Sequence, residues 1–337
     1  MASYIEPHQH TLNRPVSCCG IGLHTGKPVN MTLKPAAPNT GIRFHRSDLH
    51  SDSSVPAQVD KVVDTTLATT IGQGRARIST TEHLLAALRA SGIDNVDIDI
   101  DSYEVPIMDG SAGPFVHLLR RGGRKQQRAL RRILRITRPL DITDGDRSIR
   151  IEPYDGFKVT GRISFGDTVI KEQSYSVEVT PERFAREIAR ARTFGFVEQV
   201  EQLWNNGLAL GGNLNNVIAI HWDGQSILNE EGLRFDDEFV RHKVLDLIGD
   251  MALLGSPVLG HIIANRSGHG LHLELMRSIA DNPQCWEYVT LSRQGRFRTR
   301  KSGKTSRKHA HGPRQLSLFP GAVKSKVALG AGVACPA

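Results

Sequence analysis

Residues 78–100 read ISTTEHLLAALRASGIDNVDIDI, a stretch that predicts a helix followed by a strand. Ser79 can cap the helix, with Glu82 three positions later as its capping-box partner, and Gly92 supplies the stop. After the glycine, residues 95–100 alternate strictly between polar and apolar side chains, which is typical of a strand with one buried face. The helix and the strand should therefore pack together in one domain.

A comparable pattern recurs in the second half of the chain. Strand-like segments at 147–152 and 157–165 precede a helix opened by Thr180-Pro181-Glu182. A longer helix then runs from about Glu238 to Leu254, and a strand over 259–264 follows it. No Gly-rich phosphate fingerprint joins a strand to a helix. We therefore expect the α+β class, with two similar domains whose helices pack on one face of mainly antiparallel sheets.

Length and composition set broad limits. The 337 residues exceed what one hydrophobic core usually serves, so two domains are expected. No apolar run approaches the roughly 20 residues of a membrane span, and the first residues lack a secretory signal. No Cys-x-x-Cys pair occurs, which argues against a thiolate metal site and favours a reducing, cytoplasmic location. The cysteines are Cys18, Cys19, Cys285 and Cys335.

The net charge of +8 is concentrated in the tail. Residues 291–337 hold eleven of the 43 Lys and Arg and no acid, which leaves 32 basic against 35 acidic residues in 1–290. A second basic run, residues 120–138, contains Gly122-Gly123, and we place a domain boundary there. The expected parts are domains 1–126 and 127–290 and a disordered tail. The tail is either a solvated appendage or a contact for an anionic partner such as RNA or an acidic membrane surface.

A helical stripe in the second half carries the first candidate site residues. His242, Asp246 and Asp250 are four positions apart and so share one face of the 238–254 helix. An imidazole and a carboxylate at this spacing can supply two ligands to a zinc ion. The same spacing also occurs in ordinary surface ion pairs, and this segment alone leaves both interpretations open.

Glu82 and His83 are a second candidate pair, at the start of the first-half helix. A catalytic zinc site needs a third ligand and a nearby general base that takes a proton from water. His83 and Glu82 suit these roles. Alternatively, Glu82 caps its own helix and His83 is a satisfied, partly buried histidine.

Two further segments offer groups for proton transfer and charge stabilisation. In residues 267–272, Gly268 and Gly270 flank His269, so the backbone can approach a ligand closely, and His269 can act as a general acid if Asp250 keeps it charged. Otherwise the segment is a tight turn. In residues 190–196, the Thr193 hydroxyl can donate to an oxyanion, or the segment is core.

Six motifs in this order resemble a known family. The chain is similar, from about residue 10 to about residue 290, to the UDP-3-O-acyl-N-acetylglucosamine deacetylases, the zinc enzymes of lipid A synthesis in Gram-negative bacteria. The segments that carry the resemblance are 78–88, 106–115, 190–196, 232–235, His242-Lys243-x-x-Asp246-x-x-Gly249-Asp250 and 267–269.

The resemblance implies a role for each matched residue and a hydrolytic release of acetate from the UDP-linked acylated amino sugar. By resemblance, His83, His242 and Asp246 bind Zn²⁺, and Glu82 is the general base. His269 is the general acid supported by Asp250, Lys243 lies beside the reacting carbonyl, and Thr193 helps to hold the oxyanion. The family fold has helices packed between two sheets, with the metal site at the junction of the domains.

The resemblance also implies where the substrate binds. Leu23, Leu67, Phe194 and residues 197–217 would line an acyl-chain passage, and Phe165 and Arg266 would lie near the UDP portion, with Gly268 also at the substrate. No nucleic acid is required. Two alternatives remain open: a nucleic-acid-binding protein with structural histidines, and a zinc hydrolase of another amide, such as a peptide, although the chain has no His-Glu-x-x-His run.

Overall fold

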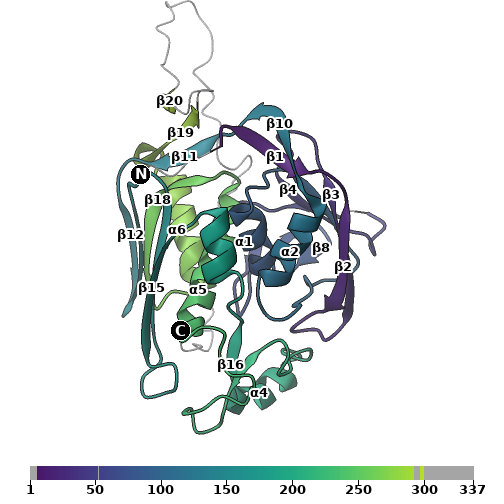
Figure 1. Cartoon of the computed structure of the whole chain (residues 1–337), viewed down its shortest axis with the longest axis vertical. Coiled ribbons are helices and arrows are strands. Elements are labelled where there is room, and N and C mark those ends of the chain that lie inside the picture. The colour runs from purple at the N-terminus through teal and green to yellow at the C-terminus, as the bar shows by residue number, and fades with distance from the viewer. Residues whose placement is uncertain (1–5, 52, 292–296, 300–337) are drawn as a thin grey trace, which may run out of the picture.

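The computed structural model describes residues 6–51, 53–291 and 297–299. Its strands form two main sheets, and the helices α1, α2, α5 and α6 lie between them (Figure 1). One core cluster joins the three layers, because buried residues of both sheets and of the helices between them belong to it. The predicted α+β class, with helices enclosed by two sheets, is confirmed.

The first sheet is built from the N-terminal half, in the order β2-β3-β9-β4-β5. In β9 the residues Val96, Ile98 and Ile100 are fully buried while the aspartates between them are partly exposed, as the alternation predicted. All neighbours pair antiparallel except β4 and β9. The strands are β2 (Val16–Ile21), β3 (Pro28–Pro35), β4 (Ile42–Arg46), β5 (Ser54–Pro56) and β9 (Val96–Ile100).

Smaller elements complete this half. Strands β6-β7-β8 form a sheet of their own, and β1 pairs with β10. Their bounds are β1 (His8–Leu12), η1 (Val59–Lys61), β6 (Val62–Asp64), β7 (Thr70–Gln73), β8 (Ala76–Ile78), α1 (Glu82–Ala90), α2 (Gly113–Gly122) and β10 (Arg124–Leu130).

The predicted capping box at the start of α1 is wrong. The helix begins at Glu82, and its N-cap, Thr81, makes no side-chain cap hydrogen bond. Ser79 instead forms a bridge with Glu104, and its hydroxyl accepts a hydrogen bond from Thr70. Ser79 therefore takes part in a strand pairing, and the Glu82 carboxylate does not cap α1.

The second sheet is built from the C-terminal half, with β18 at its centre between an antiparallel β13 and a parallel β14. The first sheet has the same arrangement around β9, which lies between an antiparallel β3 and a parallel β4. The strands are β11 (Ile133–Ile136), β12 (Leu140–Asp144), β13 (Arg147–Glu152), β14 (Phe157–Ser164), β15 (Glu172–Glu178), β18 (Val258–Asn265), β19 (Trp286–Leu291) and β20 (Phe297–Thr299).

The helices of this half follow the predicted bounds with two differences. Pro181 opens α3 and the Thr180 side chain caps it, but the next turn is π-helical. The alternative of a tight turn at His269 is wrong, because α6 begins at that residue with Gly268 as N-cap. The helical elements are α3 (Pro181–Arg183), η2 (Phe184–Ile188), α5 (Glu238–Met251), η4 (Ala252–Leu254), α6 (His269–Asp281) and η5 (Pro283–Cys285).

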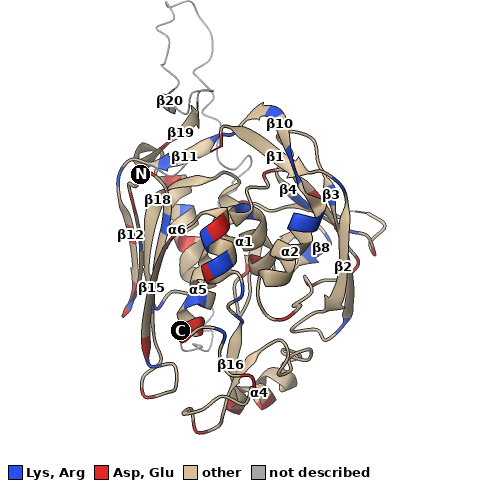
Figure 2. Cartoon of the chain, in the orientation of Figure 1, with Lys and Arg blue, Asp and Glu red and all other residues tan. Residues whose placement is uncertain are grey.

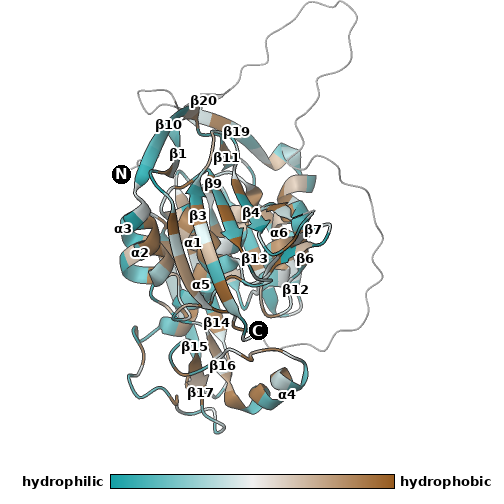
Figure 3. Ribbon diagram, turned by 90° about the vertical axis from the view of Figure 1, so that its right-hand side faces the viewer, coloured by the Kyte–Doolittle hydropathy of each residue, from teal (hydrophilic) through white to brown (hydrophobic). Residues whose placement is uncertain are grey.

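One segment projects from the layered body, at the bottom of Figure 1. It contains β16 (Phe194–Phe196), η3 (Val197–Gln199), α4 (Val200–Asn205) and β17 (Ile218–Ile220), with β16 and β17 paired in parallel. Figure 3 shows hydrophobic residues on these elements as well as on the inner helices. The projecting segment thus exposes apolar side chains, among them Trp204, Leu210 and Leu214.

The expected division at residue 126 stays a prediction. Residue 126 falls inside β10, part of the basic run that Figure 2 marks in blue, and β10 pairs with β1 from the start of the chain. In the tail, Phe297–Thr299 form β20, which pairs with β19. Residues 292–296 and 300–337, for which disorder was predicted, lie outside the described residues. Among the described residues, none of the helices combines the length and the apolar character that a membrane span needs.

Candidate active site

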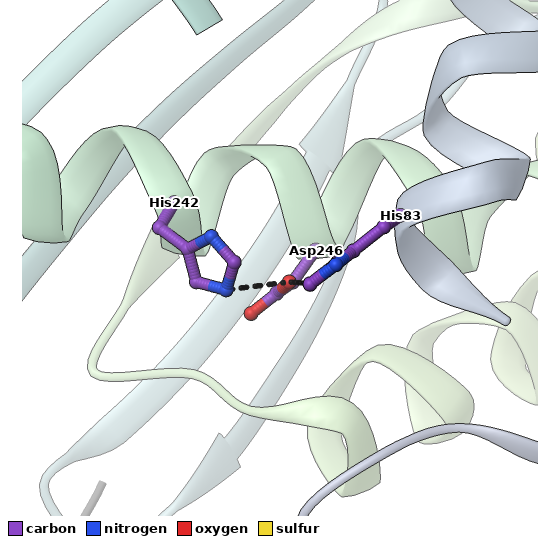
Figure 4. Close-up of side chains that lie close together, drawn as sticks. All are labelled: His83, His242 and Asp246. Carbon is purple, nitrogen blue, oxygen red and sulfur yellow. Dashed lines mark ion pairs between the residues drawn. The ribbon is translucent and has the colours of Figure 1, made fainter. Parts of the chain in front are cut away.

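Helices α1 and α5 pack directly against each other and bring the first candidate ligands together. His83 comes from α1, His242 and Asp246 come from successive turns of α5, and their side chains converge in Figure 4. The close approach requires glycine at position 249, because a Cβ there would lie 2.0 Å from the backbone oxygen of Glu82. All three candidate ligands are buried.

The surroundings of His242 fix its tautomer. Its Nδ1 lies 3.1 Å from the carbonyl oxygen of Ala191. Because a carbonyl only accepts, Nδ1 carries the hydrogen and Nε2 presents a lone pair. Burial lowers the pKa of His242 to about 3, against the opposing charge of Asp246, so the ring is neutral at physiological pH. A neutral imidazole oriented through its other nitrogen is the form that binds a metal.

Three possible ligand atoms lie close to one another. Asp246 Oδ1 lies 3.3 Å from His242 Nε2 and 3.5 Å from His83 Nε2. Burial alone would raise the pKa of Asp246, but His242 and Lys243 hold it well below its ordinary value, so the carboxylate is charged. Among the described residues, Asp246 Oδ1 is buried and receives no hydrogen bond.

This donor set fits a divalent cation. Ligand atoms about 2.0–2.1 Å from a tetrahedral zinc ion are separated by about 3.3 Å, which agrees with the two separations from Asp246. Without a cation, a lone pair would face a carboxylate at this distance, which is costly in a buried site. His83, His242 and Asp246 can thus hold a metal ion.

Glu82 lies beside these ligands as the residue before His83. Its carboxylate is buried and accepts a hydrogen bond of 3.1 Å from the backbone N–H of Thr69. Burial raises its pKa, while the nearby His269 and His83 act in the opposite direction. A carboxylate of raised pKa is suited to accept a proton near neutral pH.

Asp250 and His269 form a tight pair. Asp250 Oδ2 lies 2.7 Å from His269 Nδ1 and 2.7 Å from His272 Nδ1, and Oδ1 accepts the Thr69 hydroxyl at 2.6 Å. Burial alone would lower the pKa of His269, but Asp250 raises it to about 9. Burial alone would raise the pKa of Asp250, but His269 and His272 hold this pKa at about 2. His269 is therefore an imidazolium at neutral pH.

Thr193 is held by its backbone. Its N–H donates to the carbonyl of Gly110 at 2.9 Å, and its own carbonyl accepts from Ile218 at 2.8 Å. The preceding residue, Arg192, is almost fully buried and makes a salt bridge of 3.0 Å with the buried Glu238. These contacts fix both Thr193 and the Ala191 carbonyl that orients His242.

The candidate residues open on a largely apolar cavity of about 500 Å³. It reaches from the candidate ligands into the projecting segment. Phe165 packs edge-on against Phe194, with ring centroids 5.7 Å apart. Lining residues include Leu23, Leu67, Phe165, Thr193, Phe194, Val197, Val200, Leu203, Trp204, Leu214, Lys243 and His269.

The structure does not bring every candidate residue to this cavity. Arg266 and Gly268 are not among its lining residues, and an Arg266 nitrogen lies 2.6 Å from the carboxylate of Asp146. Sequence reasoning gave no role to Thr69 or His272. His272 could have been found, because it lies three positions after His269 on one helix face, but nothing in the sequence marks Thr69.

Comparison with known proteins finds one family. Residues 9–281 match the model of the family described as UDP-3-O-acyl N-acetylglycosamine deacetylase. The UDP-3-O-acyl-N-acetylglucosamine deacetylase of Anaeromyxobacter sp. (strain Fw109-5) is 50% identical over 285 residues, which cover 85% of this chain and 92% of the relative. The protein of the same name from Methylococcus capsulatus is 48% identical over 289 residues, covering 85% of this chain and 94% of the relative.

Proposed function

Because the chain belongs to the UDP-3-O-acyl N-acetylglycosamine deacetylase family, we propose that it hydrolyses the N-acetyl group of UDP-3-O-acyl-N-acetylglucosamine. The products are acetate and the free 2-amino sugar nucleotide, and the reaction is a step of lipid A biosynthesis. The observation that carries the proposal is the convergence of His83, His242 and Asp246 beside Glu82, at one end of an apolar cavity.

We propose Zn²⁺ as the metal held by His83, His242 and Asp246. Two imidazoles and one carboxylate are a donor set typical of catalytic zinc, which keeps a further position for water. When bound, the ion supplies Lewis-acid polarisation of a water molecule and of the acetamide carbonyl. The ligands reach this arrangement through contacts of the chain itself, above all the Ala191 carbonyl behind His242.

Glu82 and His269 divide the proton transfers. The Glu82 carboxylate accepts a proton from the attacking water. A hydrogen bond from the Thr69 N–H holds this carboxylate in place. His269, kept protonated by Asp250, gives a proton to the departing amine. The two groups differ because burial raises the pKa of the carboxyl, whereas Asp250 raises that of the imidazole.

Thr193 and Lys243 stabilise negative charge at the reacting carbonyl. The Thr193 hydroxyl donates to the developing oxyanion, since its backbone N–H and carbonyl are already bonded. Lys243 Nζ lies 3.5 Å from Asp246 Oδ2, so its ammonium group is next to the candidate ligands.

The apolar cavity accounts for an acylated substrate. Leu23, Leu67 and Phe194 lie on its wall together with apolar residues of the projecting segment, so it can take up an acyl chain. We place the UDP portion near Phe165, Arg266 and Gly268. Arg266 offers a guanidinium for phosphate recognition if it exchanges Asp146 for the nucleotide.

We place the enzyme in the cytoplasm. Among the described residues, Cys18, Cys19 and Cys285 are free thiols, which fits a reducing compartment. The rival nucleic-acid function rests on the basic tail, most of which lies outside the described residues. The apolar cavity next to the candidate ligands favours an acylated substrate over a peptide.

The proposal is tested by metal content and acetate release together. The parent protein should contain about one zinc per chain and release acetate from the acylated sugar nucleotide, and His242→Ala should lose both. The matched control is His45→Ala, which removes a histidine paired with Asp97 on the outer face of the first sheet and should leave both properties unchanged.

Two results would overturn the proposal. One is a His242→Ala variant that releases acetate as fast as the parent protein, because the converging residues would then not be the active site. The other is release of acetate from N-acetylated peptides in preference to the sugar nucleotide, which would favour a different amide hydrolase.

A further inference from the structure

Thr69 lies between the two groups to which the proposed function assigns the proton transfers. It directly precedes β7, and only 2% of its surface is exposed. Its N–H donates to Glu82 Oε2 at 3.1 Å, and its hydroxyl donates to Asp250 Oδ1 at 2.6 Å. One residue thus contacts both the proposed base and the carboxylate that supports the proposed acid.

The hydroxyl also contacts His269 itself. Because the charged Asp250 only accepts, the Thr69 hydroxyl hydrogen goes to that carboxylate, which leaves an oxygen lone pair. His269 Nδ1 lies 3.2 Å from this oxygen and 2.7 Å from Asp250 Oδ2. The Nδ1 hydrogen therefore meets two acceptors on one side, which fixes the ring plane and leaves Nε2 as the nitrogen for the substrate.

Thr69 is itself rigidly held. Its carbonyl accepts from the Thr81 hydroxyl at 3.0 Å and from the Thr81 backbone N–H at 3.3 Å. Its N–H, carbonyl and hydroxyl are all bonded, and Thr81 is the residue that directly precedes Glu82. Displacement of Thr69 would therefore move the start of α1 as well as the Asp250 carboxylate.

The contacts also cross from one half of the chain to the other. Thr69 and Glu82 belong to the N-terminal half, while Asp250 on α5 and His269 on α6 are 181 and 200 residues away from Thr69. Because the base and the acid come from different halves, their separation depends on a contact that bridges them. Thr69 is such a bridge, through its N–H on one side and its hydroxyl on the other.

We propose that Thr69 is a positioning residue that holds the Asp250–His269 pair in register with Glu82. This inference rests on the proposed function, since it assumes that Glu82 and His269 act on one substrate. Thr69 does not act on the substrate. Its hydroxyl orients the carboxylate and the imidazole so that the two proton transfers occur at fixed positions.

The chain offers a matched control in the next residue. Thr70 is equally buried, at 2% exposed, and its hydroxyl donates to Ser79 at 2.9 Å, away from the groups that Thr69 contacts. Valine replaces a threonine hydroxyl with a methyl group of similar size. Thr69→Val and Thr70→Val therefore remove the same group from neighbouring buried positions, and only the first should affect proton transfer.

The test compares steady-state kinetics of zinc-loaded variants. Thr69→Val should lower kcat by roughly 10- to 100-fold with KM and zinc content unchanged, because a hydrogen bond to a charged group is lost. Thr69→Ser keeps the hydroxyl and should restore most of kcat. Thr70→Val should match the parent. In an Asp250→Ala background, Thr69→Val should cost little more, since the two residues act together.

The outcomes separate this inference from the proposed function. A parent enzyme that releases no acetate removes the proposed function, and the inference with it. An active parent whose Thr69→Val variant keeps full kcat, or falls only as far as Thr70→Val, overturns the positioning role alone. So does a Thr69→Ser variant as slow as Thr69→Val. Should Thr69→Val not fold, Thr69→Ala removes the same hydroxyl and is compared with Thr69→Ser.

Discussion

At the scale of single residues, the site depends on how buried charges are compensated. Asp250 is 1% exposed yet remains ionised, because three donors surround its two oxygens: the Thr69 hydroxyl and the ring nitrogens of His269 and His272. An isolated buried carboxylate would take up a proton instead. The charge of Asp250 in turn stabilises the protonated form of His269.

We predict that Asp250→Asn shifts the pH profile. The raised pKa of about 9 keeps His269 protonated at neutral pH, so the rate should fall as pH rises through about 9. The amide that replaces the carboxylate carries no charge, and only Glu82 and Asp246 would still raise the pKa of His269. The basic limb of kcat/KM should therefore move to lower pH. Asp97→Asn, which affects the His45 pair outside the cavity, should leave the profile unchanged.

Thr193→Ala tests the oxyanion contact. The loss of one such donor typically lowers turnover on the order of a hundredfold or more. Zinc content should stay the same, because Ala191 orients His242 through its backbone carbonyl, which this substitution does not remove. Thr193→Ser should recover much of the rate. Full activity in Thr193→Ala would exclude the hydroxyl from the mechanism.

At the scale of elements, the contact between α1 and α5 determines whether the ligands can meet. Glycine is normally unfavourable inside a helix, by about 1 kcal/mol relative to alanine. At position 249 the absence of a side chain allows α5 to touch the first residue of α1, where any Cβ would meet the Glu82 backbone oxygen. Glycine at position 249 lowers the helix propensity of α5, but it allows α1 to come close enough for His83 to reach Asp246.

Gly249→Ala should therefore destabilise the protein although alanine is the better helix former. We expect a loss of about 3 kcal/mol in the free energy of unfolding, since overpacking costs about 1–3 kcal/mol and here the obstacle is backbone. Thermal unfolding and zinc content should both report it. The control is Gly270→Ala on α6, where a Cβ meets nothing closer than 3.8 Å and stability should hold or rise. Equal effects at the two positions would contradict the argument.

The elements also show where sequence patterns succeed and fail. Alternation over 95–100 predicted β9, and helical spacing predicted that His242, Asp246 and Asp250 share a face, because both are periodic within one segment. The start of α1 was missed because the Ser79–Glu82 spacing fits a capping box, while Ser79 pairs with Glu104 from a distant segment. Only tertiary contacts decide between the two.

At the scale of the whole molecule, the two halves share the candidate metal site. His83 comes from one half, and His242 and Asp246 come from the other, so a cation bound there would tie the two halves together. The structure brings these three residues together, as the family resemblance implies, and their role as metal ligands stays a prediction. Residue types alone suggested His83 as a third ligand but left other interpretations open, because His83 is far from Asp246 in the sequence. Thr69 could not be found at all, because its contacts with Asp250 and His269 span 181 and 200 positions and leave no local pattern.

Metal removal should therefore lower global stability. A ligand at 100 times its Kd contributes about 2.7 kcal/mol to the free energy of unfolding. A chelator should lower the Tm of the parent, and added zinc should restore it. His83→Ala should respond to neither, because the remaining two ligands lie on one helix. An equal chelator effect on His83→Ala would place the stabilising metal elsewhere.

The basic tail gives the last prediction. The family match ends at residue 281, and the candidate site residues all lie before it, so a chain shortened after residue 300 keeps β20 and every proposed catalytic group. Residues 301–337 hold seven Lys and Arg and no acid, so their removal takes the net charge from +8 to +1. Deacetylation should be unchanged, while retention on a heparin column should fall, because binding to polyanions follows the number of cationic contacts. A shortened chain that folds but releases no acetate would show that the tail is required for catalysis.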